Sequence, residues 1–531
     1  MEHNNNTPEE AKEQQPSEPS TQQAASDTKE PIAADLQQNI NTVKQALGNS
    51  DDIVVREIRI GKVGNVKAAI FYTDGLTGSQ ALADFVMESL LMDMKNTELD
   101  QMISFGQDVL NVLKERALTV GGVKEVADFD VLFHSLLSGD AILLFEGHTQ
   151  GFAIGVREWN QRSVTEPATE TIVRGPRESF TENIRTNTAL IRRKIKDRNL
   201  WLETRTIGRV TQTDVSIMYI KGIASDNVID EVRQRLDRID IDGILESGYI
   251  EEFIQDETYT PFPTIYNTER PDVVAADLLE GRVAILVDGT PFVLTAPAMF
   301  TQFFQAAEDY YQRADVSSLL RVLRFFSFFI ALFGSSTYIA ITTFHQEMLP
   351  TALLISLAAQ REGVPFPAII EALMMETALE ILREASVRMP RAVGQAVSIL
   401  GTLVIGTAAV EAGIVSAAMV IVISITAISS FIFPAPNMSI AVRLIRFPMM
   451  VLAASFGLYG MIAGFIALVL HLCSLRSFGI PYTSPLAPYN ANDQEDTIFR
   501  LPHWRMRTRP RLISQQNVTR EQPSTNPRSR T

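Results

Sequence analysis

The feature that most constrains this chain is the stretch between Arg391 and Arg443, which contains a single charged side chain, Glu411. A water-soluble surface needs ionisable groups far more often, because charged residues stay exposed to solvent. Residues 392–410 and 412–433 consist almost wholly of apolar or small side chains. At a rise of about 1.5 Å per residue, about 20 such residues cross the roughly 30 Å hydrocarbon core of a bilayer. We therefore expect two membrane-spanning helices here.

Two more stretches are apolar enough and long enough to cross a bilayer, at residues 325–344 and 447–472. Residues 348–360 are apolar too, but this segment is too short for a full crossing and suits a partly inserted helix. The sequence thus predicts an all-α, multi-pass membrane domain at residues 314–475, with four full crossings. An even number of crossings leaves both ends on one side, and the arginines of residues 476–531 favour the cytoplasm.

The part before the first predicted span contains a repeated pattern. Residues 130–147 (DVLFHSLLSGDAILLFEG) resemble residues 272–289 (DVVAADLLEGRVAILVDG). Each reads as a helix that ends in Leu-Leu-x-Gly, a buried strand, an acidic residue and a turn glycine. We expect a cytoplasmic α/β region of two related modules, at residues 36–210 and 211–313, after a disordered polar tail at residues 1–35. The alternative is that any helix–glycine–strand unit gives this likeness.

Local patterns in the soluble part predict further elements. Helices are expected at residues 36–47, 80–94, 102–113, 178–198 and 228–239, and strands at 54–60, 66–71, 201–210 and 214–220. The helix at 178–198 lies in a basic stretch that could hold a nucleic acid or lipid headgroups, or be a solvated face or an ion-pair surface between the modules. This stretch has no interleaved aromatic residues for base stacking, and the net charge of −15 argues against a nucleic-acid partner.

The sequence carries no recognisable catalytic or metal-binding pattern. It has one cysteine, Cys473, so it cannot form an intrachain disulfide, and its six histidines are far apart. No phosphate-binding GxxxxGK[ST] loop, GxSxG elbow or GxGxxG turn is present. We therefore expect no enzyme activity, no cofactor and no metal site.

A face of small residues runs along one predicted span. Gly394, Ser398, Thr402 and Gly406 follow one another at four-residue steps. Small faces let helices pack closely in lipid, whereas Ser398 and Thr402 could instead border a water-filled ion path. Glu411, between two spans, is a further candidate for this path, although so short a turn favours a place at the interface with water.

Three glutamates share one face of the helix expected at residues 368–385. Glu376, Glu380 and Glu384 lie at four-residue steps and are candidates for the lining of an aqueous vestibule. The alternative is an ordinary wet or interfacial helix face.

A helix break is expected where Pro434 and Pro436 precede Asn437. Residues 434–439 would then have irregular backbone. At membrane depth such backbone requires a protein-lined or wet cavity.

Several of these stretches resemble one known family, the A subunit of the GerA-type spore germinant receptors of endospore-forming bacteria. The most specific stretch is residues 363–416 (GVPFPAIIEALMMETALEILREASVRMPRAVGQAVSILGTLVIGTAAVEAGIVS). Residues 173–193 (VRGPRESFTENIRTNTALIRR), 439–448 (SIAVRLIRFP) and 481–488, followed by Arg500-Leu501-Pro502, agree as well. The resemblance covers roughly residues 50–512.

The resemblance implies a multi-pass protein of the spore inner membrane. It implies two partners, a transporter-like B subunit and a lipoprotein C subunit, and a role in nutrient-triggered germination with early ion release. It further implies that copies of the A subunit form the ion-conducting part as a homo-oligomer in membrane lipid. The alternatives are a non-conducting scaffold, for germination or for dipicolinate release, and a secondary solute transporter. The sequence does not identify the nutrient.

Overall fold

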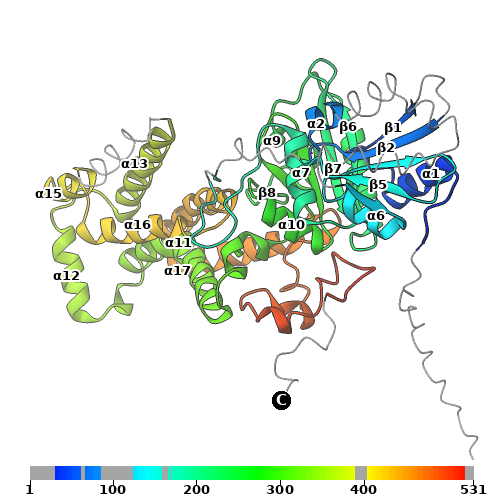
Figure 1. Ribbon diagram of the computed structural model, residues 1–531. Helices are drawn as coiled ribbons and strands as arrows, with labels where there is room; N and C mark the ends of the chain where they lie inside the picture. Colours follow the sequence, from blue (N-terminus) through cyan, green and yellow to red (C-terminus); the bar gives the residue numbers. More distant parts are fainter. Residues whose placement is uncertain are drawn as a thin grey trace, which may run out of the picture.

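The computed structural model describes residues 30–60, 66–84, 123–157, 166–167, 169–388 and 404–520. These residues form two antiparallel sheets with their helices and, beside them, a group of long helices, which extends to the left in Figure 1. Most of the predicted polar tail, residues 85–94 of one predicted helix and the whole predicted helix at 102–113 lie outside the described residues.

The first sheet has the strand order β1-β2-β4-β5-β3, and every neighbouring pair is antiparallel. Its elements are α1 (Leu36–Ala46), β1 (Ile53–Ile60), β2 (Val66–Thr73), α2 (Ser79–Asp84), β3 (Val123–Val126), α6 (Phe129–Leu136), β4 (Ala141–Phe145) and β5 (Gly151–Ile154). Helices α1 and α6 begin where Asp35 and Asp128 accept hydrogen bonds from free N–H groups of the first turn. Their apolar faces pack on the sheet around Val43, Phe71 and Leu132.

The second sheet repeats this arrangement with the order β6-β7-β9-β10-β8. Its elements are α7 (Ile184–Lys194), β6 (Leu200–Ile207), β7 (Thr213–Ile220), α8 (Asp226–Asp237), α9 (Ser247–Ile254), β8 (Tyr266–Thr268), α10 (Pro271–Leu279), β9 (Val283–Val287) and β10 (Val293–Ala296). Helices α7 and α10 cover one face of this sheet, in an apolar cluster that includes Ile191 of α7, Leu278 of α10 and Leu202 of β6. Helices α8 and α9 contribute to a second apolar cluster around Val232, Ile250 and Ile285.

The repeated pattern in the sequence corresponds to equivalent places in the two sheets. Its two copies form α6 with β4 and α10 with β9. Gly139 and Gly281 have φ of 96° and 94°, and Gly147 and Gly289 have φ of 83° and 92°. These are left-handed values that glycine adopts without a steric penalty. The two sheets with their helices, called the first and the second module below, therefore share this unit at equivalent places.

The predicted boundary near residue 210 falls inside a hairpin. Strand β6 pairs with β7 in register from Leu200↔Ile220 to Ile207↔Thr213. Helix α7, which precedes β6, packs against the same sheet. The second module therefore begins with α7, which is shorter than the predicted helix at 178–198 and starts after the cap of Asn183.

The basic stretch around α7 forms ion pairs, and two of these join the modules. Arg192 is fully buried and donates from Nε and Nη2 to the two carboxylate oxygens of Asp52, at 2.6 and 2.8 Å. Arg185 pairs with Asp74 of the first module. These two arginines therefore form ion pairs between the modules, which is one of the alternatives that the sequence left open.

The long helices follow the second module. They are α11 (Ala314–Thr343), α12 (Thr351–Arg361), α13 (Ala368–Arg388), the π-helical turn η5 (Val404–Ala408) with α15 (Ala409–Glu411), α16 (Ala417–Ser430) and α17 (Pro436–Ser474). Short 3-10 helices and a two-stranded sheet are η2 (Phe300–Phe304), η3 (Ala307–Tyr310), η4 (Gln346–Met348), β11 (Arg476–Ser477), β12 (Ile480–Pro481), η6 (Asn492–Glu495) and η7 (His503–Arg505). In the described part of the chain, α11 and α17 are long and apolar enough to cross a membrane.

Three predicted spans differ from the helices that form, and the fourth, at 392–410, lies largely outside the described residues. Helix α11 starts eleven residues before the predicted span at 325–344. Residues 412–433 form only α16, whose 14 residues measure about 21 Å, less than the roughly 30 Å of a hydrocarbon core. The span is shortened because Gly413 has a φ of 66° and Ser416 caps the helix. The predicted span at 447–472 covers the later part of α17, which is interrupted at Gly457.

Helix α17 is a hairpin of two arms rather than one straight rod. Gly457 interrupts it with a φ of 62° and a ψ of −142°, a combination that is almost confined to glycine. A Cβ atom on Gly460 would lie 2.3 Å from the carbonyl oxygen of Leu452, and one on Gly464 would lie 2.7 Å from Met449 Sδ. The returning arm therefore packs tightly against the outgoing one.

The two arms begin and end near the second module. Phe433, just before α17, stacks edge-on against Phe304, and His471 in its last turn is hydrogen-bonded to Thr260. The turn at Gly457 instead lies against His345, just past the end of α11. Helix α11 and the first arm thus run away from the sheets, and the second arm returns to them.

The predicted break before α17 is displaced. Residues 431–435 connect α16 to α17, whereas Pro436 occupies the first turn of α17 and Asn437 is helical. Proline is well tolerated in a first turn, because its missing N–H has no helical partner there. Of the predicted residues, Pro434 alone lies in the break.

Candidate functional site

The helical part is held together by a buried ion pair between α13 and α17. Arg446 Nη1 donates to Glu376 Oε1 and Oε2 at 2.9 and 2.8 Å, and both side chains are 2% exposed. Arg446 Nε donates to the carbonyl oxygen of Ala331, and Ser335 Oγ donates to Glu376 Oε1. Because Ala331 and Ser335 belong to α11, this pair joins three helices.

A second pair lies one turn along α13. Arg443 Nη1 donates to Glu380 Oε2 at 2.6 Å, and Arg383 Nη1 donates to Glu380 Oε1 at 3.2 Å. Arg383 also donates to Ser430 Oγ at the end of α16. Glu384 is exposed and pairs with Arg388 of its own helix. That these glutamates line a vestibule stays a prediction. In the structure, Glu376 and Glu380 each form an ion pair with an arginine of α17.

Glu371 is a buried carboxylate that sequence reasoning missed. It accepts hydrogen bonds from the backbone N–H of Ser416 at 2.9 Å and from Ser416 Oγ at 2.8 Å. Arg361 Nε lies 3.5 Å from its other oxygen. The available signal was a charged residue in an apolar helix, and it was overlooked because Glu371 does not share the four-residue spacing of the other glutamates.

The predicted small-residue face is only partly described. Gly394, Ser398 and Thr402 lie outside the described residues. Gly406 lies in the π-helical turn η5, near Val420 of α16, and Glu411 is exposed at the end of α15. An ion path along this face stays a prediction. Within the ranges that the structure describes, no group of three or more His, Cys, Asp or Glu side chains could hold a metal ion.

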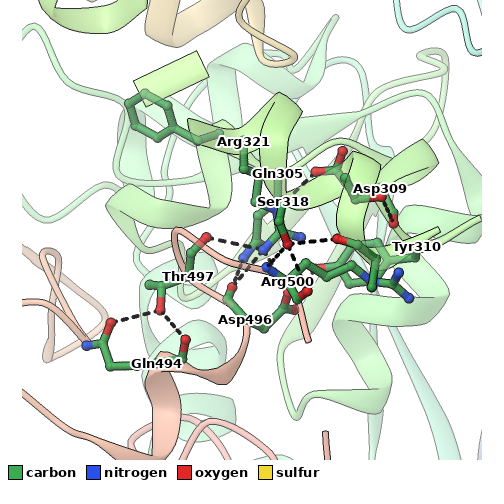
Figure 2. A network of polar contacts seen from close by, with 12 residues as sticks. Gln305, Asp309, Tyr310, Ser318, Arg321, Gln494, Asp496, Thr497 and Arg500 are labelled. Atoms are coloured by element: carbon green, nitrogen blue, oxygen red, sulfur yellow. Dashed lines mark hydrogen bonds and ion pairs between the residues drawn. The ribbon is translucent and has the colours of Figure 1, made fainter. Parts of the chain in front are cut away.

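A charged junction connects α11 to the second module and to the C-terminal region (Figure 2). Arg321 donates from Nε to Asp309 Oδ2 at 3.1 Å and from Nη1 to Asp496 Oδ1 at 2.7 Å. Tyr310 OH donates to the other oxygen of Asp496 at 2.7 Å. Arg324 Nη1 donates to Asp309 Oδ2 at 2.6 Å. Asp309 therefore accepts from two arginines on successive turns of one helix.

The junction is buried, and burial sets its protonation. Burial raises the pKa of the Asp496 carboxyl, and the nearby Arg321 guanidinium opposes this shift. Burial likewise raises the pKa of the Tyr310 hydroxyl well above its usual value. A buried charge is tolerated when a partner and hydrogen bonds compensate it. Sequence reasoning missed Asp309 and Asp496 because their partner is distant in the chain.

A cavity of about 310 Å³ adjoins this junction, where the α16–α17 connection meets the second module. Its lining includes Glu170, Arg270, Glu308, Arg324 and residues 431–434. Burial raises the pKa of Glu170 to about 7, against a hydrogen bond of 2.6 Å from Thr268 Oγ1 that favours the charged form. The cavity is polar and places a titratable carboxyl group beside the helix break.

Two sheets of the same order, joined through a charged junction to apolar helices with buried ion pairs, define a protein with a sheet-rich α/β part and a helical part. The model of the Bacillus/Clostridium GerA spore germination protein family matches residues 41–512. This chain belongs to that family.

Similar proteins agree with this assignment. The chain is 51% identical over 492 residues to spore germination protein KA of Bacillus subtilis (strain 168), which covers 92% of this chain and 89% of the relative. It is 46% identical over 487 residues to the uncharacterized membrane protein YfkQ of the same organism, over 92% and 93% of the two chains. The crystal structure of the N-terminal domain of the A subunit of the Bacillus megaterium spore germinant receptor GerK3 covers 51% of this chain and 98% of that chain, with 44% identity and a TM-score of 0.41. The family resemblance stated from the sequence is confirmed.

Proposed function

We propose that this chain is the A subunit of a nutrient germinant receptor in the spore inner membrane, where it couples nutrient sensing to ion release and so triggers germination. The family and the relatives named as spore germination proteins support this proposal. The two long apolar helices, and a relative named as a membrane protein, support a place in the membrane. A transporter-like B subunit and a lipoprotein C subunit are the proposed partners.

The observation that carries the coupling is that α11 belongs to two charged clusters at once. Arg321 and Arg324, near its start, bind Asp309 and the C-terminal region. Ala331 and Ser335, further along, contact the Glu376–Arg446 pair. A helix transmits displacement along its axis because its backbone is hydrogen-bonded throughout. Movement of the second module would therefore reach the buried ion pair through α11.

Ion release itself is proposed to take place between copies of this chain, along the face of Gly394, Ser398, Thr402 and Gly406, with Glu411 at its mouth. Replacing Ser398 or Thr402 with leucine should then slow ion release while the protein stays in the membrane. Normal release by both variants would contradict the path. Purified chain that binds its partners in liposomes without any conductance would favour the non-conducting scaffold.

The coupling is tested by Asp309→Asn in intact spores. The carboxylate holds two arginines of α11, and the amide can no longer balance their charge. We expect slower nutrient-triggered release of monovalent cations at an unchanged level of the protein in spore membranes. Asp315→Asn is the matched control, because Asp315 lies at the exposed start of the same helix and pairs only with Arg313 there.

Two outcomes would contradict these proposals separately. Equal release rates in the two variants would exclude the route through the junction. The receptor function itself would be excluded if spores that lack this chain germinated at the normal rate with every nutrient of a broad panel.

A further inference from the structure

The second module carries an exposed apolar stripe. Leu245, Tyr249 and Phe253 follow one another at four-residue steps along α9 and the residue pair before it, and they are 68%, 40% and 51% exposed. Tyr259, in the loop that follows, is 95% exposed. Tyr249 and Phe253, which are four residues apart within α9, lie on one face of this helix, and Leu245 lies just before its start. The neighbouring face of α9 is instead buried against the module through Ile250 and Ile254.

The end of this stripe lies next to the end of α17. Thr260, which follows Tyr259, is hydrogen-bonded through Oγ1 to His471 Nε2 at 2.8 Å. The ring of Phe262 lies 6.3 Å from the same histidine. In Figure 1, α9 and β8 lie on the side of the sheets that faces the helices. Tyr259 is thus placed where the returning arm of α17 leaves the helical part.

The returning arm has an exposed apolar stripe of its own. Ile462, Ile466 and Leu470 are also four residues apart, and they are 57%, 54% and 66% exposed. The arm that begins after Gly457 reaches His471 after 14 residues, or about 21 Å, so His471 lies towards the end of the arm near the second module. The stripe on this arm ends at Leu470, beside His471, which is hydrogen-bonded to Thr260 next to Tyr259.

We propose that the stripe of Leu245, Tyr249, Phe253 and Tyr259 rests on the lipid surface, with its aromatic rings at the level of the headgroups. This inference rests on the proposed membrane location of the helices. Tyrosine is enriched at membrane–water interfaces because its ring is apolar and its hydroxyl is polar. A contiguous apolar surface exposed to water is unusual in a monomeric protein and marks a contact.

The negative charges beside the stripe indicate which kind of lipid headgroup it would contact. Glu252 and Glu257 are exposed next to it, and carboxylates are repelled by the negative surface potential of anionic lipids. The surface that fits is therefore zwitterionic, such as phosphatidylcholine, and the contact weakens as the fraction of anionic lipid increases.

The test uses the full chain in phosphatidylcholine nanodiscs and a nitroxide spin label on single cysteines. Cys473→Ser removes the single native cysteine, and Phe253→Cys and Tyr259→Cys each place a label on the stripe. Ile466→Cys is the lipid reference. Val131→Cys, on an exposed position of α6 in the first module, is the water reference. Collision of each label with oxygen, which concentrates in lipid, is compared with collision with a polar nickel chelate, which stays in water.

We expect the labels at 253 and 259 to favour oxygen over nickel by at least half the margin seen at 466, and the label at 131 to favour nickel. Labels at 253 and 259 that match the one at 131 would overturn the contact while leaving the membrane location intact. Labels there that meet neither reagent would show that protein covers the stripe, either this chain or a second copy of it, which also overturns the lipid contact. A label at 466 that favours nickel would instead refute the membrane location. Tyr249→Cys repeats the measurement should either variant fold poorly.

Discussion

At the scale of single residues, the buried pair of Glu376 and Arg446 dominates the helical part. Each side chain is 2% exposed, and each has the other as its charged partner. Taking a charge out of water costs several kcal/mol, and the partner compensates this cost only while both are present. Removal of one member leaves the other buried and uncompensated.

We expect Glu376→Gln to lower the free energy of unfolding by about 3–5 kcal/mol, because the Arg446 charge then lacks its counterion. The measurement is denaturant unfolding in detergent. The double variant Glu376→Gln/Arg446→Met should lose less than the sum of the two single variants, because it leaves no orphaned charge. Glu384→Gln is the control and should change stability by at most about 1 kcal/mol, since its pair with Arg388 is exposed. Additive losses in the double variant would contradict the pairing.

Glu170 makes stability depend on pH. Its pKa is about 7 in the folded chain, because of burial, whereas its ordinary pKa is 4.5. Between these values the folded chain holds a proton that the unfolded chain releases, so stability falls as the pH rises from about 4.5 to about 7. Relative to Glu170→Gln, the native chain should lose up to about 3 kcal/mol over this range.

The readout is the difference in unfolding free energy between the two chains at successive pH values. Glu166→Gln, an exposed carboxylate nearby in the chain, serves as the control and should track the native chain. A difference between the native chain and Glu170→Gln that does not vary with pH would disprove the assignment.

At the scale of elements, the sequence predicted the soluble part better than the helical part. The repeated pattern identified α6 with β4 and α10 with β9, because a turn glycine and a buried strand are local features. The hairpin of α17 was missed, because Gly457 stands in an apolar run that composition cannot divide. The junction and the Glu376–Arg446 pair were missed because their partners are far apart in the chain, and pairing over such distances leaves no local pattern.

Gly457→Ala should disrupt the hairpin of α17. An alanine cannot adopt a φ of 62° with a ψ of −142° without strain, and its Cβ would lie 2.6 Å from the His345 ring. We expect a loss of about 2 kcal/mol or more in unfolding free energy, measured by denaturant unfolding in detergent. Gly363→Ala is the control, because a Cβ there meets no atom within 4 Å. Equal stability of the two variants would show that α17 has no sharp reversal.

At the scale of the whole molecule, the chain returns to the module from which its helices depart. The C-terminal region packs on the second module, where Arg520 pairs with Glu280 and Ser514 Oγ donates to the carbonyl oxygen of Ile223. It also holds the start of α11 through Asp496. The second module and the C-terminal region therefore lie at one end of the helices.

Cysteine labelling measures this arrangement directly. In a Cys473→Ser background, Val131→Cys and Tyr489→Cys should react with a membrane-impermeant maleimide from the same side of sealed vesicles. Met348→Cys, near the distal end of α11, should react from the opposite side. All three positions are exposed. Labelling of Tyr489→Cys from the side of Met348→Cys would require an odd number of crossings.

The buried contact of Arg192 with Asp52 determines which motions of the two sheets cost little free energy. Separating the two sheets would leave the buried charges of Arg192 and Asp52 without their partners. Rotating the two sheets together keeps both hydrogen bonds between these side chains. We therefore expect the two modules to move together as one body. A slight tilt of the two sheets together would then act on the start of α11, which Asp309 and Asp496 hold through Arg321.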